Sequence, residues 1–119
     1  MYSEQLLDHF QNPRNAGDIS DADARAEIEN PVCGDVLRLT MRVKDGRVEE
    51  IRFKAKGCVA SMACASALTA LVTGKTVQDA RALDREQVIA AVGGLPPAST
   101  HAAQLAIDAL AKILDQIEV

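Results

Sequence analysis

Four side chains that can bind a metal ion stand where secondary-structure elements are expected to begin or end. Cys33 and Asp35 lie in a loop between two strand-like segments. Cys58 stands where a strand gives way to a helix, and His101 falls in the first turn of the last helix. Two thiolates, a carboxylate and an imidazole suit zinc or iron. The ends of elements can meet at one edge of a small domain, so the four residues are candidate ligands of one centre, although their long, irregular spacing leaves convergence open.

Cys58 has the most informative local sequence. It directly follows Gly57, and a long run of small and apolar residues, typical of a buried helix, begins after it. Free backbone N–H groups and the positive end of the helix dipole favour a thiolate at such a position, and the thiolate is the form that binds metals or acts as a nucleophile. The alternative is a small buried cysteine that seals the strand-to-helix turn.

Two of the other candidates also have structural alternatives. Asp35 could cap the turn before its strand. His101 could hydrogen-bond a loop carbonyl from the start of its helix. The second histidine, His9, is interpreted as a surface or loop-anchoring imidazole rather than a ligand.

The third cysteine, Cys64, is expected to be a core residue. It follows Cys58 by six positions, which in a helix places it about 9 Å further along the axis and about 240° around it. Two sulfurs so arranged cannot easily reach one small site. Cys64 also shares a helix face with Leu68 and Leu71, as a buried cysteine would.

The first half of the chain predicts a small antiparallel sheet that would position these groups. Small or apolar residues alternate with polar and charged ones at 24–29 and 37–43, the period of half-buried strands. The Asp-Gly pair at 45–46 predicts a tight turn into a third strand. Val48 is out of phase with the apolar residues of that strand, so we expect either a bulge near 49–50 or a strand that packs only after it.

Helices are expected before and after the strands in the sequence. Ser3 predicts the N-cap of a short first helix, and the chain after Gly57 is expected to be helical, with further N-caps at Thr76 and Asp84. The prolines of 95–100 predict a stiff, extended link. Apolar residues mark the core face of the final helix, namely Ala102, Leu105, Ala106, Ala109, Leu110, Ile113, Leu114 and Ile117. Strands followed by helices predict an α+β fold, a small three-stranded antiparallel sheet with helices packed on one face.

Composition limits the classes of function. A chain of 119 residues, 48% of them hydrophobic, predicts one domain over 1–119 with a core of its own. Three cysteines, an odd number, and a start without a signal-peptide pattern predict a reducing cytoplasm rather than a disulfide scaffold. No apolar run approaches a membrane span. A formal charge of -4 with 3% aromatic residues supplies neither a phosphate-neutralising patch nor a stacking platform, which excludes nucleic acid as a partner.

Several short motifs, in order and with compatible spacing, together resemble the NifU/IscU-type (SufU-like) iron-sulfur cluster assembly scaffolds. The matching segments are 2–10, 12–17, Asn30-Pro31-Val32-Cys33-Gly34-Asp35, Phe53-Lys54-Ala55-Lys56-Gly57-Cys58, 74–76, and Leu95-Pro96-Pro97 with His101. They span nearly the whole chain. The resemblance implies that 1–119 form one NifU/IscU-like N-terminal domain of the α+β class.

The resemblance also implies a function and a site. Family members assemble a [2Fe-2S] or related cluster from iron and from sulfur supplied by a cysteine desulfurase, and pass it to apo-proteins. By position, Cys33, Asp35 and Cys58 correspond to family ligands or sulfur acceptors, and His101 to the histidine beside the third cysteine. That cysteine is missing here, because the chain has Ala102 where family members usually carry it.

Three classes of function therefore follow. The first and preferred one is a scaffold or carrier, not an enzyme, that holds iron or a labile [2Fe-2S] cluster and can form a homo-oligomer. The second is a zinc-bound protein that accepts a persulfide from a desulfurase, with zinc as the resting metal. The third is a degenerate, non-catalytic partner or regulatory subunit.

Overall fold

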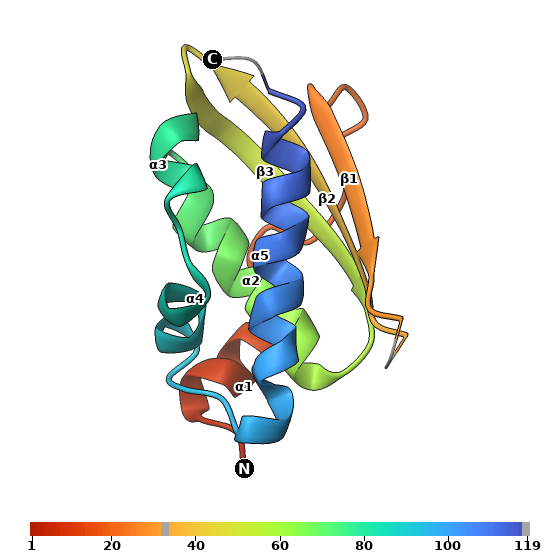
Figure 1. Cartoon of the computed structure of the whole chain (residues 1–119), viewed down its shortest axis with the longest axis vertical. Helices are drawn as coiled ribbons and strands as arrows, with labels where there is room; N and C mark the ends of the chain where they lie inside the picture. The colour runs from red at the N-terminus through yellow and green to blue at the C-terminus, as the bar shows by residue number, and fades with distance from the viewer. Residues whose placement is uncertain (32–33, 118–119) are drawn as a thin grey trace.

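The computed structural model describes residues 1–31 and 34–117 (Figure 1). Helices and strands follow in the order α1 (Glu4–Gln11), β1 (Ala24–Glu29), β2 (Val36–Lys44), β3 (Arg47–Lys56), α2 (Val59–Val72), α3 (Val77–Arg81), α4 (Arg85–Ala91), the short 3-10 helix η1 (Pro97–Ser99) and α5 (Thr100–Leu114). Strands come first and most of the helices after them, so the predicted α+β class is confirmed.

The three strands form one antiparallel sheet in the order β1-β2-β3. Asp45 and Gly46 join β2 to β3, and both have positive φ, 54° and 75°, as the predicted tight turn requires. The pairing shifts after Arg42, which lies opposite Glu50, whereas Val43 lies opposite Val48. Glu49 is therefore the extra residue of the expected bulge, and the shift turns Val48 into the core, where it is fully buried.

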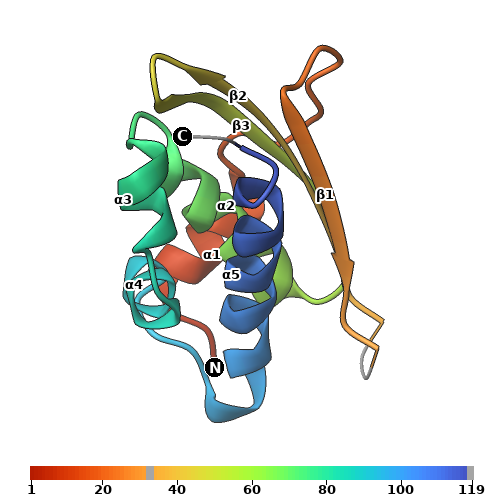
Figure 2. The ribbon, with the colours of Figure 1, turned by 45° about the horizontal axis from the view of Figure 1, so that its top comes forward.

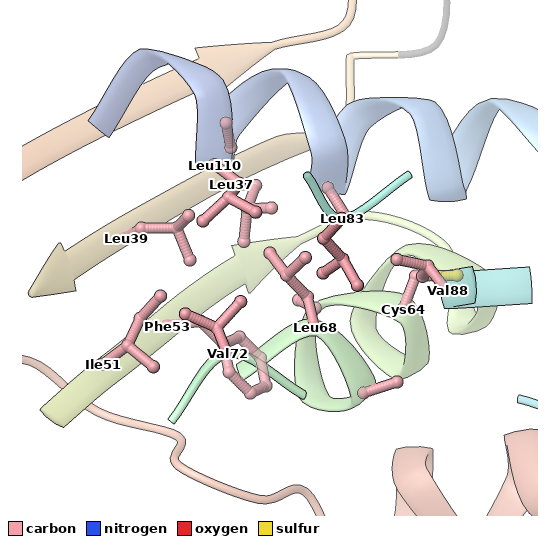
Figure 3. Close-up of a cluster of buried hydrophobic side chains, with 14 of the residues drawn as sticks. Leu37, Leu39, Ile51, Phe53, Cys64, Leu68, Val72, Leu83, Val88 and Leu110 are labelled. Atoms are coloured by element: carbon pink, nitrogen blue, oxygen red, sulfur yellow. The ribbon is translucent and has the colours of Figure 1, made fainter. Parts of the chain in front are cut away.

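Helices α2 and α5 lie across the same face of the sheet (Figures 1 and 2). Helix α2 packs on β3, and α5 packs on β1 and β2. Apolar side chains of the sheet and of these helices meet in the core shown in Figure 3, where Leu37, Leu39, Ile51 and Phe53 face Leu68, Val72 and Leu110. Burying this face against the two helices fixes where α2 and α5 begin relative to the strand ends.

Helix α1 packs against α2 and begins at the predicted N-cap, where the Ser3 hydroxyl accepts a hydrogen bond from the backbone N–H of Leu6. His9 Nδ1 lies 2.8 Å from the hydroxyl of Ser66 in α2, and the same hydroxyl accepts from the backbone N–H of Arg14. Burial, aided by the charge of Arg14, lowers the pKa of His9. His9 therefore anchors the loop after α1, as its sequence interpretation suggested.

Two local expectations were wrong, and both have a physical reason. Residues 97–99 form η1 rather than an extended link, because the φ that proline imposes also suits the first residue of a helical turn. The last helix ends at Leu114, so Ile117 lies beyond it. Arg81 donates hydrogen bonds to the backbone carbonyls of Leu114 and Ile117, at 2.9 and 3.2 Å, and holds the chain where it leaves the helix.

Candidate metal centre

Three of the four predicted ligands come together in the structure. One side-chain atom from each of Asp35, Cys58 and His101 lies within 4.8 Å of the other two. The carboxylate comes from the loop before β2, the thiol from the N-terminus of α2 and the imidazole from the first turn of α5. Cys33, the fourth predicted ligand, lies outside the described residues. The packing of α2 and α5 on one face of the sheet therefore brings together three residues that are far apart in the sequence.

Cys58 is the N-cap of α2. Its backbone is extended, and its sulfur accepts a hydrogen bond of 3.4 Å from the backbone N–H of Ser61. An N-cap side chain faces the free N–H groups and the positive end of the helix dipole. Cys58 is half-buried rather than sealed in the core. Its sulfur thus combines a favourable electrostatic position with access from outside.

Asp35 lies at the centre of the group. Its side chain is nearly buried, with the whole residue 5% exposed. Its Oδ2 atom is 3.5 Å from Cys58 Sγ, 3.7 Å from His101 Nε2 and 2.6 Å from the hydroxyl of Ser61. A carboxylate oxygen that faces a thiol and an imidazole places three metal-binding groups around one point, which suits a cation such as zinc or iron.

His101 forms the outer side of the centre. Its side chain is 37% exposed, against 7% for the side chain of Asp35. Among the described residues, its ring nitrogen Nε2 faces Asp35 Oδ2 at 3.7 Å and makes no hydrogen bond to a loop carbonyl. The centre is therefore closed at its base by Asp35 and open along the edge where His101 stands.

Gly57 shapes the base of the centre. Its φ is +151°, and a Cβ atom added to it would lie 2.2 Å from Asp35 Oδ1. Only a glycine lets the end of β3 approach the carboxylate so closely. In the sequence Gly57 marked only the end of a strand, and nothing in its neighbours indicated that it packs against Asp35.

Cys64 is a core residue, as expected. It is fully buried among the side chains shown in Figure 3. Burial raises the pKa of its thiol to about 12. A thiol that stays protonated at neutral pH is neither a good ligand nor a nucleophile.

The profile of the NifU-like N-terminal domain matches residues 1–118. The chain belongs to this family. Similar proteins include an iron-sulfur cluster assembly scaffold protein of Archaeoglobus fulgidus, 46% identical over 114 residues that cover 96% of this chain and 74% of the relative. A scaffold protein of the same description from Aquifex aeolicus is 40% identical over 111 residues, which cover 92% of this chain and 71% of the relative.

Solved structures share the NifU-like fold. A crystal structure from Fervidobacterium islandicum, a candidate iron-sulfur cluster assembly scaffold for the SUF system, superposes with a TM-score of 0.81 at 22% identity, covering 95% of this chain and 96% of that one. The N-terminal part of a NifU-like protein from Brucella abortus gives 0.76 at 21% identity, with coverage of 97% and 92%. None of the helices that the structure describes is both long and apolar enough to cross a membrane.

Proposed function

We propose that this chain is an iron-sulfur cluster assembly scaffold or carrier, acting as one domain over 1–119. The observation that carries the proposal is the meeting of a thiol, a carboxylate and an imidazole within 4.8 Å at a partly open edge of the molecule. The names of the two relatives described above support the same function and do not favour the zinc-bound sulfur-transfer or regulatory alternatives. The iron or cluster is cargo that the protein holds and passes on.

Cys58, Asp35 and His101, together with Cys33, would hold that cargo. Sulfur, nitrogen and oxygen ligands in one site fit iron, and they fit zinc as a resting metal. A site with at most two thiolates binds a cluster less firmly than four cysteines do, which suits transfer better than electron carriage. The exposed side at His101 gives the incoming sulfur and the receiving protein a route to the centre.

Partners follow from this role. A cysteine desulfurase would supply sulfur, and apo iron-sulfur proteins would receive the finished cluster. The chain itself would hold iron and sulfur in position for cluster assembly rather than convert a substrate, so we propose no enzymatic activity. A reducing cytoplasm is the compartment in which the thiols of Cys33 and Cys58 would stay reduced, and a cluster shared between two copies would link them into a homo-oligomer.

Anaerobic reconstitution tests the proposal. Purified protein incubated with ferrous iron, cysteine, a cysteine desulfurase and excess dithiothreitol, which reduces the persulfide sulfur to sulfide, should turn brown, absorb visible light and contain iron and sulfide in equal amounts. Metal and sulfide analysis is the decisive measurement. Protein that stays colourless and retains zinc through this treatment would contradict the scaffold function and favour sulfur transfer.

The missing third thiol gives a prediction that tests the position of the site. Ala102 follows His101 in the first turn of α5 and is 1% exposed. We expect Ala102→Cys to retain a reconstituted cluster longer against a chelator, because a third thiolate is a softer ligand than carboxylate or imidazole. Since Ala102 is packed, the added sulfur should also cost about 1–3 kcal/mol of unfolding free energy.

Two measurements separate this gain from this cost. Loss of visible absorption after adding a chelator reports how firmly the cluster is held, and thermal unfolding of the metal-free protein reports the packing. A variant that folds but loses its cluster as fast as the wild type would show that residue 102 does not face the centre.

A further inference from the structure

We propose that Ser61 is a positioning residue of the metal centre, whose hydroxyl holds the Asp35 carboxylate in place beside Cys58 and His101. Ser61 was not among the residues that sequence reasoning selected. A serine within an apolar helix carries no pattern that distinguishes a packing role from a functional one. The proposal rests on the proposed function, since it assigns Ser61 a role toward the metal that the centre binds.

Ser61 contacts two of the proposed ligands at once. It is the third residue of α2, one turn after Cys58, and is 5% exposed. Its hydroxyl oxygen is 2.6 Å from Asp35 Oδ2 and 3.2 Å from Cys58 Sγ, and its backbone N–H donates to the same sulfur at 3.4 Å. The serine therefore links the base of the centre to the helix start.

The distances indicate where the hydroxyl proton lies. A hydroxyl has one proton to donate, and 2.6 Å is the length of a charge-assisted O–H···O bond to a carboxylate. The proton therefore goes to Asp35, and the lone pairs of the serine oxygen are left facing the sulfur of Cys58. Ser61 thus acts on the metal centre mainly through the carboxylate.

Two neighbours together fix the orientation of the Asp35 side chain. Gly57 leaves room for Oδ1 on one side, while Ser61 holds Oδ2 on the other. With Oδ2 held by Ser61 and space for Oδ1 beside Gly57, Oδ2 points toward Cys58 and His101 before any ion arrives. A ligand that is oriented in advance loses less freedom on binding, and partners that orient a ligand are commonly worth 10- to 100-fold in metal affinity.

The chain offers a matched control in Ser66. This serine lies in the same helix and is fully buried, but its hydroxyl contacts His9 and the backbone of Arg14 rather than any proposed ligand. Removing either hydroxyl takes one hydrogen-bonding group from the buried part of α2. Only the removal of the Ser61 hydroxyl should affect the metal.

The experiment compares Ser61→Ala, Ser61→Thr and Ser66→Ala with the wild type. Zinc and ferrous iron are each titrated, under anaerobic conditions, in competition with a chromogenic chelator. We expect Ser61→Ala to bind both ions about tenfold more weakly, Ser61→Thr to recover most of the affinity because it keeps a hydroxyl, and Ser66→Ala to bind like the wild type. Alanine is the better helix former, so the variant should fold, which circular dichroism of the metal-free protein checks.

A double-mutant cycle then tests whether Ser61 acts through Asp35. In an Asp35→Ala background, Ser61→Ala should cause no further loss of affinity. An equal loss in both backgrounds, or no loss in either, would overturn the assignment while leaving the metal centre standing. A wild-type protein that binds neither ion would overturn the proposed function and this assignment with it.

Discussion

Replacing Cys33 and Cys58 together by Ser should lower the affinity for iron or zinc by more than about 100-fold. Residues that only orient a metal ligand already contribute about 10- to 100-fold to metal affinity, and the ligands themselves should contribute more. Thiolate is the soft ligand in the proposed set, and the remaining carboxylate and imidazole hold these metals much less firmly. Either single change should already remove most of the metal. The measurement is metal content per chain after gel filtration in the presence of a weak chelator.

The fold should survive this change. Cys58 is an N-cap whose sulfur accepts from the backbone N–H of Ser61, and serine is a preferred N-cap residue that can accept the same hydrogen bond. Cys64→Ala is the matched control, because it removes a fully buried thiol from the core and should lower stability without releasing metal. Undiminished metal in the Cys33→Ser, Cys58→Ser double variant would contradict a shared site.

Local sequence patterns predicted most of the fold, because strands, turns and helix caps depend mainly on residues that are close together in the sequence. Alternation at 24–29 and 37–43, together with the Asp-Gly turn, predicted the three strands. The out-of-phase Val48 predicted either a bulge near 49–50 or a strand that packs only after it, and the structure has the bulge, with Glu49 as the extra residue. The N-cap predicted at Asp84 is present, and it forms a capping box with Gln87. The link at 95–100 was misjudged because proline is compatible with both an extended chain and the start of a helical turn.

The assembly of the site could not be derived from such patterns. Cys58 lies 23 positions beyond Asp35, and His101 reaches them only because α5 crosses the same face of the sheet as α2. Residue types and the resemblance to the family both pointed to these residues, but neither gave their arrangement. Neither the hydrogen bond from Ser61 nor the close approach of Gly57 can be recognised from amino-acid composition or hydrophobic periodicity. Both depend on the position of Asp35, which is distant in the sequence.

Gly57→Ala should have the second large effect, on stability and metal binding together. A φ of +151° is one that residues with a Cβ avoid, and the new methyl group would lie 2.2 Å from Asp35 Oδ1 and 3.0 Å from its Cβ. Backbone strain of this kind costs about 1–3 kcal/mol, and overpacking costs a similar amount. Because Asp35 has a short side chain, the carboxylate must move away from Cys58 and His101, so metal affinity should fall at least about tenfold.

Gly74→Ala separates the clash from the strain. Gly74 also has a positive φ, +86°, but an added Cβ would meet no atom within 4 Å. That variant should lose some stability in chemical denaturation and bind metal normally. Adding Asp35→Ala to Gly57→Ala should restore part of the stability, because the methyl group then gains space, yet it should not restore the metal. If Gly57→Ala binds iron and zinc as tightly as Gly74→Ala does, the carboxylate is not held at the centre by the end of β3, and the space beside Gly57 does not set the orientation of Asp35.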